Sequence, residues 1–336
     1  MIILGIETSC DDTSAAILHE QSILANVVST QIVHKNFGGI VPELASRAHI
    51  QSIVPVIQEA LKESKITLKD LDGLAVTYGP GLAGSLLVGL SVSKGLALSL
   101  NIPFIGVNHL EGHIWANKLV RPDLEPPFVV LVVSGGHTQL VYVKTWGQYQ
   151  MLGRTRDDAA GEAFDKVGKL LKLGFPGGPV IEKMAEKGRA DTVSFPRAFL
   201  EKDSLDFSFS GLKTAVLNYV MTLDSGKLEK SIPDIARSFQ DAVIDVLVQK
   251  TLSAAEKMKV KQICLAGGVA VNGALQKQMK EACQKAGYQV FWPSPALCAD
   301  NGAMIAAAGA FYLTRQIHSS NNLNPVPTLN FTHDTS

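Results

Sequence analysis

Residues 128–143 read FVVLVVSGGHTQLVYV, which predicts an apolar strand, a tight Ser-Gly-Gly turn and a second strand rich in β-branched and aromatic residues. The N-terminus repeats this design, because the apolar run IILGI at 2–6 is followed by the polar turn ETSCDDTS and then by AAIL. A second pair of segments, 72–100 and 261–287, predicts in each case a strand, a glycine-rich loop and a helix. The same order of units occurs twice, which predicts a duplicated α/β fold.

The composition indicates a globular protein with two domains and no overall charge. A chain of 336 residues, 46% of them hydrophobic, is longer than a single hydrophobic core usually supports, so two domains are expected. Lys+Arg and Asp+Glu balance at 31 each, so nucleic-acid binding would need a local patch or the surface of a partner. No uncharged apolar run reaches the ~18 residues of a membrane span, and the N-terminus lacks the pattern of a signal peptide. The four cysteines are scattered, without C-x-x-C, as in buried thiols of a reducing compartment. These features predict a cytoplasmic protein without a membrane segment.

Several helices and a disordered tail are predicted outside the repeated segments, including a helix entered from the turn in GFPGGPVIEKMA. One helix covers about 159–171, with Asp157 and Asp158 as candidate N-caps, and another covers about 235–257. A small-residue helix, NGAMIAAAGAFYL, follows Asp300. The tail at 318–336 is polar, with two prolines and several asparagines, which favours disorder.

His109 and His113, in the stretch VNHLEGHIWA, lie four positions apart and would share one face of a helix. The spacing alone is weak evidence, since eight histidines in 336 residues give about 0.2 such pairs by chance. A zinc protease is disfavoured, because its H-E-x-x-H motif needs the Glu next to the first His. Glu111 is instead about 200° round the helix from His109, and it fits a capping box with Asn108.

A metal site needs a third ligand, and Asp300 at the start of the C-terminal helix is the candidate. The alternative is that Asp300 only caps that helix. Two His and one carboxylate suit Fe(II) or Zn with open positions for a substrate. The loops VVSGGHTQ and LAGGVAVN place glycines directly after strands, where backbone amides can approach a phosphate or sugar. Either loop alone could be a plain turn, but two in a duplicated frame indicate a nucleotide between the halves.

Ten motifs in one order, from residue 1 to about 310, resemble the tRNA threonylcarbamoyladenosine transferase family, formerly called O-sialoglycoprotein endopeptidases. They are GIETSCDDTSAAIL, GGIVPELASRAH, YGPGLAGSLLVG, NHLEGH, VSGGHTQL, GEAFDKVGKLL, FPGGP, FSFSGLKTA, AGGVAVNGALQ and CADNGAMIA. The resemblance implies two ribonuclease-H-like halves of the actin, Hsp70 and sugar-kinase superfamily around a central nucleotide cleft. The expected halves are 1–124, joined by the C-terminal helix 300–317, and 125–299.

The resemblance also implies the reaction and its partners. The family transfers a threonylcarbamoyl group from threonylcarbamoyl-adenylate to the exocyclic amine of the adenosine beside the anticodon, in tRNAs that read codons beginning with A. AMP is released. Bacterial members work with an actin-like paralogue and a small ATPase, whereas archaeal and eukaryotic members use a kinase-containing complex.

Site residues follow from the same resemblance. His109, His113 and Asp300 would hold one metal ion, with iron expected and zinc the alternative. Asp11 resembles an acidic residue with a suspected catalytic role. Glu182 departs from those family members that have Asp there. The residues expected to bind the adenylate are Val132, Val133, Ser134, Gly135, Gly136, Asp165, Gly178, Glu182 and Asn272.

Two other functions use the same fold. An ATP-dependent small-molecule kinase usually places Asp-x-Gly in the first hairpin, whereas the turn here is IETSCDD without glycine. A nucleotide-gated scaffold would not need two histidines and an acid near the nucleotide.

Overall fold

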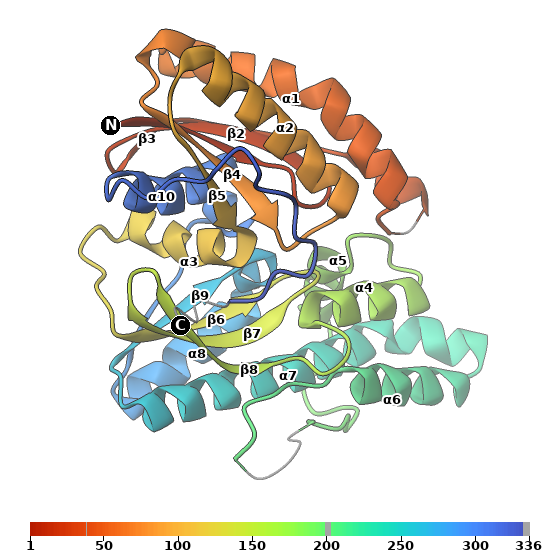
Figure 1. Cartoon of the computed structure of the whole chain (residues 1–336). Helices are drawn as coiled ribbons and strands as arrows, with labels where there is room; N and C mark the ends of the chain where they lie inside the picture. The colour runs from red at the N-terminus through yellow and green to blue at the C-terminus, as the bar shows by residue number, and fades with distance from the viewer. Residues whose placement is uncertain (38, 199–202, 332–336) are drawn as a thin grey trace. The chain divides into compact units, whose positions relative to one another are not determined.

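The chain folds into two units (Figure 1). Unit 1 comprises Met1–Leu124 and Pro293–Ser336, and unit 2 comprises Glu125–Trp292. The chain returns to unit 1 earlier than residue 300, where the sequence placed the return. The computed structural model describes residues 1–37, 39–198 and 203–331.

Unit 1 is built on a five-stranded sheet with the order β3-β2-β1-β4-β5. Strands β1, β2 and β3 are antiparallel neighbours, whereas β4 and β5 run parallel to β1. The nearly continuous apolar run of β1 lies at the centre of the sheet, as expected of a strand covered on both faces. The strands are β1 (Ile2–Glu7), β2 (Asp12–His19), β3 (Ser22–Thr30), β4 (Gly73–Gly79) and β5 (Phe104–Asn108).

Helices cover both faces of this sheet (Figure 1). Helices α1 and α2 pack against each other and against the sheet, and α10 packs against β1, β2 and β4. Close contact with α10 requires glycine, since a Cβ on Gly5 would lie 2.2 Å from the carbonyl oxygen of Gly302. The helices are α1 (Pro42–Ser64), α2 (Ala83–Leu100), α3 (His109–Val120), α9 (Pro295–Cys298) and α10 (Gly302–Leu313), with 3₁₀ turns η1 (Ile32–Phe37) and η2 (Leu68–Asp70).

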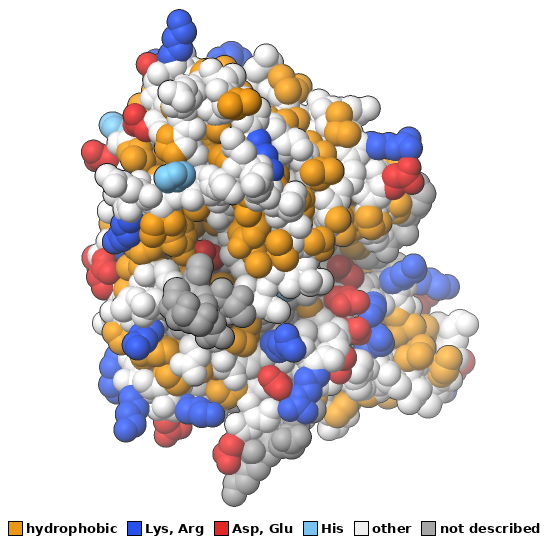
Figure 2. All heavy atoms as spheres, viewed as in Figure 1, with side chains coloured by type: hydrophobic (Ala, Val, Ile, Leu, Met, Phe, Trp, Pro, Cys, Tyr) orange, Lys and Arg blue, Asp and Glu red, His pale blue; other side chains and the backbone are white. Residues whose placement is uncertain are grey.

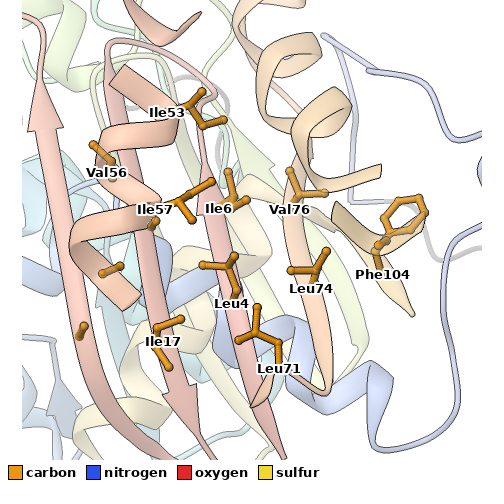
Figure 3. Packing of buried hydrophobic residues seen from close by; sticks show 14 of the residues in the cluster. Leu4, Ile6, Ile17, Ile53, Val56, Ile57, Leu71, Leu74, Val76 and Phe104 are labelled. Atoms are coloured by element: carbon orange, nitrogen blue, oxygen red, sulfur yellow. The ribbon is translucent and has the colours of Figure 1, made fainter. Parts of the chain in front are cut away.

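The hydrophobic core of unit 1 follows from the two-residue period of its strands (Figure 3). Leu4 and Ile6 of β1 point to one face, where they meet Ile53 and Ile57, one turn apart on α1. Each fully buried side chain of this kind contributes about 1.5–3 kcal/mol. The core therefore fixes β1 and leaves the polar residues after its carboxyl end at the edge of the sheet.

Unit 2 repeats this plan with the strand order β10-β9-β6-β7-β8. Strands β6, β7 and β8 are antiparallel neighbours, and β9 and β10 continue the sheet parallel to β6. The predicted duplication is therefore confirmed. The strands are β6 (Phe128–Val133), β7 (Thr138–Thr145), β8 (Gln148–Arg154), β9 (Gln262–Ala266) and β10 (Gln289–Phe291). The helices are α4 (Ala160–Leu170), α5 (Gly177–Ala185), α6 (Ser210–Met221), α7 (Ser225–Met258) and α8 (Gly273–Ala286), with the 3₁₀ turn η3 (Gly268–Val271).

The predicted N-caps of the helix near 159–171 are wrong, although the helix itself is confirmed as α4. The carboxylate of Asp157 accepts from the backbone N–H groups of Phe209 and Ser210 at 2.8 and 3.2 Å, at the start of α6. Asp158 pairs with Lys166 at 2.7 Å. Neither side chain caps α4, and the partners of Asp157 lie about fifty residues further along the chain. The second predicted helix is also confirmed, but α7 begins ten residues earlier, at Ser225, where Asp224 caps it.

Residues 318–331, here called the C-terminal strap, run along the edge of unit 1 and differ from the disorder predicted for 318–336. The N–H of Ser319 donates to Phe104 O, and the N–H of Val326 donates to Tyr78 O, each at 2.8 Å. Leu323 packs against the core cluster, and a Cβ on Gly79 would lie 2.1 Å from Val326 O. Polar composition favours disorder only when a segment lacks such partners. The last five residues of the prediction lie outside the described residues.

Helix α2 is long and apolar enough to span a membrane by length and composition, with a mean hydropathy of 1.5. It packs on β4 and α1, and Leu86, Leu90 and Ala97 are buried there. These contacts make α2 a helix of the unit 1 core.

Candidate metal centre and glycine-loop pocket

Helix α3 begins directly after β5 and carries both histidines of the predicted pair. Asn108 caps it, since its side-chain oxygen accepts from the N–H groups of Leu110 and Glu111 at 2.9 and 3.4 Å. His109 and His113 are both buried, with ring centroids 4.7 Å apart. The strand, the cap and the helical period thus bring the two imidazoles to one side of α3.

Asp300 lies beside the two imidazoles. Its Oδ1 atom is 3.2 Å from Nε2 of His113 and 3.6 Å from Nε2 of His109. Asp300 is not the cap of α10, because that helix is capped by Asn301, whose side chain accepts from the N–H of Met304 at 3.0 Å. The capping alternative for Asp300 is therefore wrong.

The His109, His113 and Asp300 group fits a metal ion. One ligand atom from each residue lies within 4.8 Å of the others, among the described residues. Within the part of the chain that the structure describes, neither ring nitrogen of His113 has a hydrogen-bond partner of acceptable geometry, although Nε2 is near Asp300. A buried polar atom without a partner costs about 1–3 kcal/mol, and a metal ion would supply the missing partner. Two imidazoles and a carboxylate are ligands of Fe(II) and Zn.

Glu7, the last residue of β1, contacts the metal group and was missed from the sequence. Its Oε2 lies 3.0 Å from Nδ1 of His109 and accepts from the Thr77 hydroxyl at 2.5 Å. Its Oε1 accepts from the N–H of Ser9 at 2.5 Å. The available signal was a carboxylate that ends a strand apolar enough to be fully buried.

The carboxylates of Glu7 and Asp300 and the imidazole of His109 shift one another's pKa values. Burial works to lower the pKa of His109, but the carboxylates of Glu7 and Asp300 outweigh it and raise that pKa to about 9. Burial works to raise the pKa of Glu7, but attraction and a hydrogen bond from His109 hold it below its ordinary value. Glu7 is therefore an ionised acceptor beside His109.

Asp11 lies in the turn between β1 and β2 and is half-buried. Burial, and then the Asp300 carboxylate, raise its pKa above the ordinary value. His49 of α1 holds the same turn, because its Nε2 donates to Cys10 O at 2.9 Å and its Nδ1 accepts from the Thr13 hydroxyl at 2.8 Å. Asp11 is therefore a fixed carboxyl with a raised affinity for a proton.

Five of the predicted adenylate residues line one pocket of about 290 Å³ in unit 2: Gly135, Asp165, Gly178, Glu182 and Asn272. Asp165 Oδ1 accepts from the N–H of Gly177 at 2.6 Å, and Glu182 Oε1 accepts from the N–H of Gly273 at 2.6 Å. Asn272 caps α8 through the N–H of Leu275. These side chains thus hold the loops that form the pocket wall.

The other predicted adenylate residues lie elsewhere. Val132 and Val133 are in β6, and their side chains are fully buried in the core. Ser134 forms the hairpin turn, where its N–H donates to His137 O at 2.8 Å. Gly136 lines a separate hollow, with Arg154 and Arg156 among its neighbours. The apolar run that predicts a strand also buries its valines.

Glu111 does not belong to the metal group. Its carboxylate accepts from the hydroxyl of Tyr312 at 2.7 Å, on α10. This position agrees with the helical geometry that disfavoured a zinc protease.

Solved structures share this duplicated fold. HypF from T. kodakarensis matches with a TM-score of 0.65 and 15% identity, over 94% of this chain and 48% of that chain. Component A of (R)-2-hydroxyglutaryl-CoA dehydratase from Acidaminococcus fermentans matches with a TM-score of 0.53 and 16% identity, over 92% and 97%. The chain is thus an α/β protein with the duplicated actin-like ATPase fold and a group of side chains suited to a metal.

Sequence comparison identifies the family. The model of TsaD, tRNA N6-adenosine threonylcarbamoyltransferase, matches residues 22–307. A protein of that name from Desulfitobacterium hafniense is 53% identical over 333 residues, which are 98% of this chain and 97% of the relative. Another from Clostridium perfringens strain 13 is 51% identical over 330 residues, with the same coverage. The chain belongs to the tRNA N6-adenosine threonylcarbamoyltransferase family, and the kinase and scaffold alternatives are not favoured.

Proposed function

We propose that this transferase moves a threonylcarbamoyl group from threonylcarbamoyl-adenylate to the N6 amine of the adenosine beside the anticodon, in tRNAs that read codons beginning with A. A bond forms between N6 and the carbamoyl carbon, and the bond from that carbon to the phosphate oxygen breaks. AMP leaves, and N6 loses a proton. The observation that carries the proposal is the His109, His113 and Asp300 group in a chain of this family.

The reaction depends more on the positioning of donor and tRNA than on a nucleophile supplied by the enzyme. The donor is a mixed anhydride, so its leaving group is already good and needs no covalent intermediate. The aromatic amine of adenosine is a poor nucleophile, so holding the two reactants in register supplies most of the rate. Fixed glycine loops and buried imidazoles suit that role.

His109, His113 and Asp300 would hold one metal ion, with iron expected and zinc the alternative. The ion would supply an electrophile that offsets negative charge on the donor's oxygens. The two histidines need no movement for this, since both are already buried on one side of α3.

The adenylate part of the donor would occupy the unit 2 pocket lined by Gly135, Asp165, Gly178, Glu182 and Asn272. A Cβ on Gly135 or on Gly178 would meet no atom of the described residues within 4 Å, so both glycines face open space there. Backbone amides can approach a ligand there without a side chain in the way. The other predicted residues, 132–134 and 136, flank Gly135 in the β6 strand and the hairpin turn, and their part would be to hold that turn in place.

Asp11 is the proposed general base for the N6 proton. It lies in the first turn with a raised pKa, which favours proton uptake. Asp11→Asn keeps the shape of the side chain and removes the base, so turnover should fall while donor binding is kept. Near-normal turnover of this variant would remove Asp11 from the proposal.

We also propose tRNA, an actin-like paralogue and a small ATPase as the partners of this chain in the cytoplasm. Its formal charge of zero gives no general attraction for tRNA. Hydrophobic side chains lie exposed over α2 (Figure 2), and Leu87 and Leu98 of α2 and Ile50 of α1 are 53%, 75% and 64% exposed. An exposed apolar face of this kind is typical of a protein interface.

The experiment supplies the purified protein and its two partners with synthetic threonylcarbamoyl-adenylate and an unmodified tRNA transcript. Nucleoside mass spectrometry should detect threonylcarbamoyladenosine with the wild-type protein and none with His109→Ala/His113→Ala. The matched control is His19→Ala/His318→Ala, two exposed histidines, which should keep full activity. No product from the wild type, with the partners folded and bound, would contradict the proposed reaction.

A further inference from the structure

Glu7 has the geometry of a residue that orients a metal ligand. It is fully buried at the end of β1, and its Oε2 lies 3.0 Å from Nδ1 of His109. Nε2 of His109, on the other side of the ring, lies 3.6 Å from Asp300 Oδ1. The imidazole therefore stands between two carboxylates, with one nitrogen facing each.

The carboxylate of Glu7 is itself held by donors that leave it little freedom. The N–H of Ser9 can only donate, and it reaches Oε1 at 2.5 Å. The hydroxyl of Thr77, on the neighbouring strand β4, donates to Oε2 at 2.5 Å. Nδ1 of His109 lies 3.2 Å from the Ser9 hydroxyl and 3.0 Å from Glu7 Oε2. The hydroxyl can accept as well as donate, whereas the carboxylate can only accept, so the shorter contact with Glu7 places the hydrogen on Nδ1.

We propose that Glu7 is a positioning residue that fixes His109 in the Nδ1–H tautomer and thereby presents the lone pair of Nε2 to the metal. A carboxylate that accepts from the second nitrogen of a metal-binding histidine fixes the ring and makes it a stronger ligand. His113 has no such support, since neither of its nitrogens has a hydrogen-bond partner among the described residues. Glu7 therefore sets the orientation in which Nε2 of His109 faces the ion. The assignment rests on the metal site of the proposed function.

Glu7→Gln is the informative substitution because it keeps the shape of the side chain. An amide nitrogen facing His109 would donate to Nδ1 and move the ring hydrogen to Nε2, where it blocks the ligand position. An amide nitrogen facing Ser9 would oppose the backbone N–H instead. Both orientations weaken the support of His109 while the apolar core around β1 is unchanged.

The matched control is Glu111→Gln. Glu111 is also a buried glutamate and lies on α3 with His109, but its carboxylate accepts from Tyr312 on α10. The measurement is the dissociation constant for Co²⁺, from its visible absorption and by competition with a chelator, together with the thermal midpoint. Glu7→Gln should weaken Co²⁺ binding by about 10–100-fold. Glu111→Gln should bind Co²⁺ within about threefold of wild type, whatever its thermal midpoint.

A folded Glu7→Gln protein with wild-type Co²⁺ affinity would overturn the assignment. Should that variant fail to fold, nitrogen NMR of the Zn²⁺-loaded wild type decides, because the assignment requires a hydrogen on Nδ1 of His109. A hydrogen-free Nδ1 would overturn it. Wild-type protein that takes up no Co²⁺ or Zn²⁺ would overturn the metal site and this assignment together. Loss of metal affinity in Glu7→Gln without any transferase activity in the wild type would uphold the role of Glu7 and reject the proposed reaction.

Discussion

The two units share one strand order but place different chemistry where their strands end. In unit 1, the candidate site is formed by side chains that are mostly buried. Glu7 of β1 and His109 and His113 of α3 contact one another or Asp300. In unit 2, the loops that follow the corresponding strands are rich in glycine. The carboxylates of Asp165 and Glu182 accept hydrogen bonds from backbone N–H groups there. The two units thus share one scaffold, but the loops of unit 1 carry functional side chains, whereas those of unit 2 present backbone. Unit 1 should therefore be sensitive to lost functional groups, and unit 2 to added volume.

The largest effect is expected from Asp300→Ala in unit 1. It removes a carboxylate that faces both imidazoles, so metal affinity should fall by about 100-fold or more, since loss of an outer partner alone costs about 10–100-fold. Asp300 caps no helix, so without metal its removal should change the free energy of unfolding chiefly through the lost attraction to His109.

Asn301→Ala is the reciprocal test, since Asn301 is the cap of α10. It should cost about 1–2 kcal/mol of stability and leave metal affinity near that of the wild type. Isothermal titration and urea unfolding of both variants measure the four values. An Asp300→Ala protein that binds metal normally would remove Asp300 from the group.

A smaller effect is expected from the C-terminal strap of unit 1. Leu323 packs against the core cluster, so Leu323→Ala should lower the free energy of unfolding by about 2 kcal/mol. Removal of residues 319–336 should lower it further, whereas removal of 332–336 alone serves as the control. Urea unfolding measures all three, and equal stability of the two truncations would contradict a structural role for the strap.

In unit 2, Gly178→Ala adds one methyl group where no atom of residues 1–37, 39–198 or 203–331 lies within 4 Å. The variant should be as stable as wild type, yet bind AMP about tenfold more weakly, because overpacking against a ligand costs about 1–3 kcal/mol. The control is Gly211→Ala, which also adds a methyl group in open space. Gly287 is unsuitable as a control, because its φ of +74° would strain an alanine. Equal AMP affinity for Gly178→Ala and the control would place the nucleotide outside this pocket.

The smallest effect is expected from Asp157→Asn, also in unit 2. Partial burial works to raise the pKa of Asp157, but hydrogen bonds from Ser208, Phe209 and Ser210 outweigh it, and the pKa lies below its ordinary value of 3.8. A lowered pKa stabilises the folded state above the unfolded pKa, and this stability is lost as the pH falls through the folded value. The variant should lose about 1 kcal/mol at pH 7.

This loss should be constant from pH 7 to about pH 5 and shrink below about pH 4, in urea unfolding at each pH. A difference between wild type and variant that does not shrink at all as the pH falls below 4 would mean that the charge of Asp157 is not what stabilises the start of α6.

Local sequence predicted the duplicated strands and most of the helices, because apolar periodicity and glycine turns are local signals. It did not predict what pairs across long separations. The partners of Asp157 lie some fifty residues away, at Phe209 and Ser210. Glu7 reaches His109 across about a hundred residues, and polarity alone suggested disorder for the strap. The spacing of His109 and His113 is visible in the sequence. Whether Asp300 caps α10 is decided only by the structure, in which Asn301 is the N-cap.

Unit 1 is discontinuous in sequence, and this has a consequence for biosynthesis. Helix α10 lies directly on β1, where Gly5 meets Gly302. A ribosome that adds about 5–20 residues per second delivers Met1–Leu124 first, then the whole of Glu125–Trp292, and only afterwards α10. The half that begins the protein must therefore wait, with one face of its sheet uncovered, while the half that follows can complete its own core.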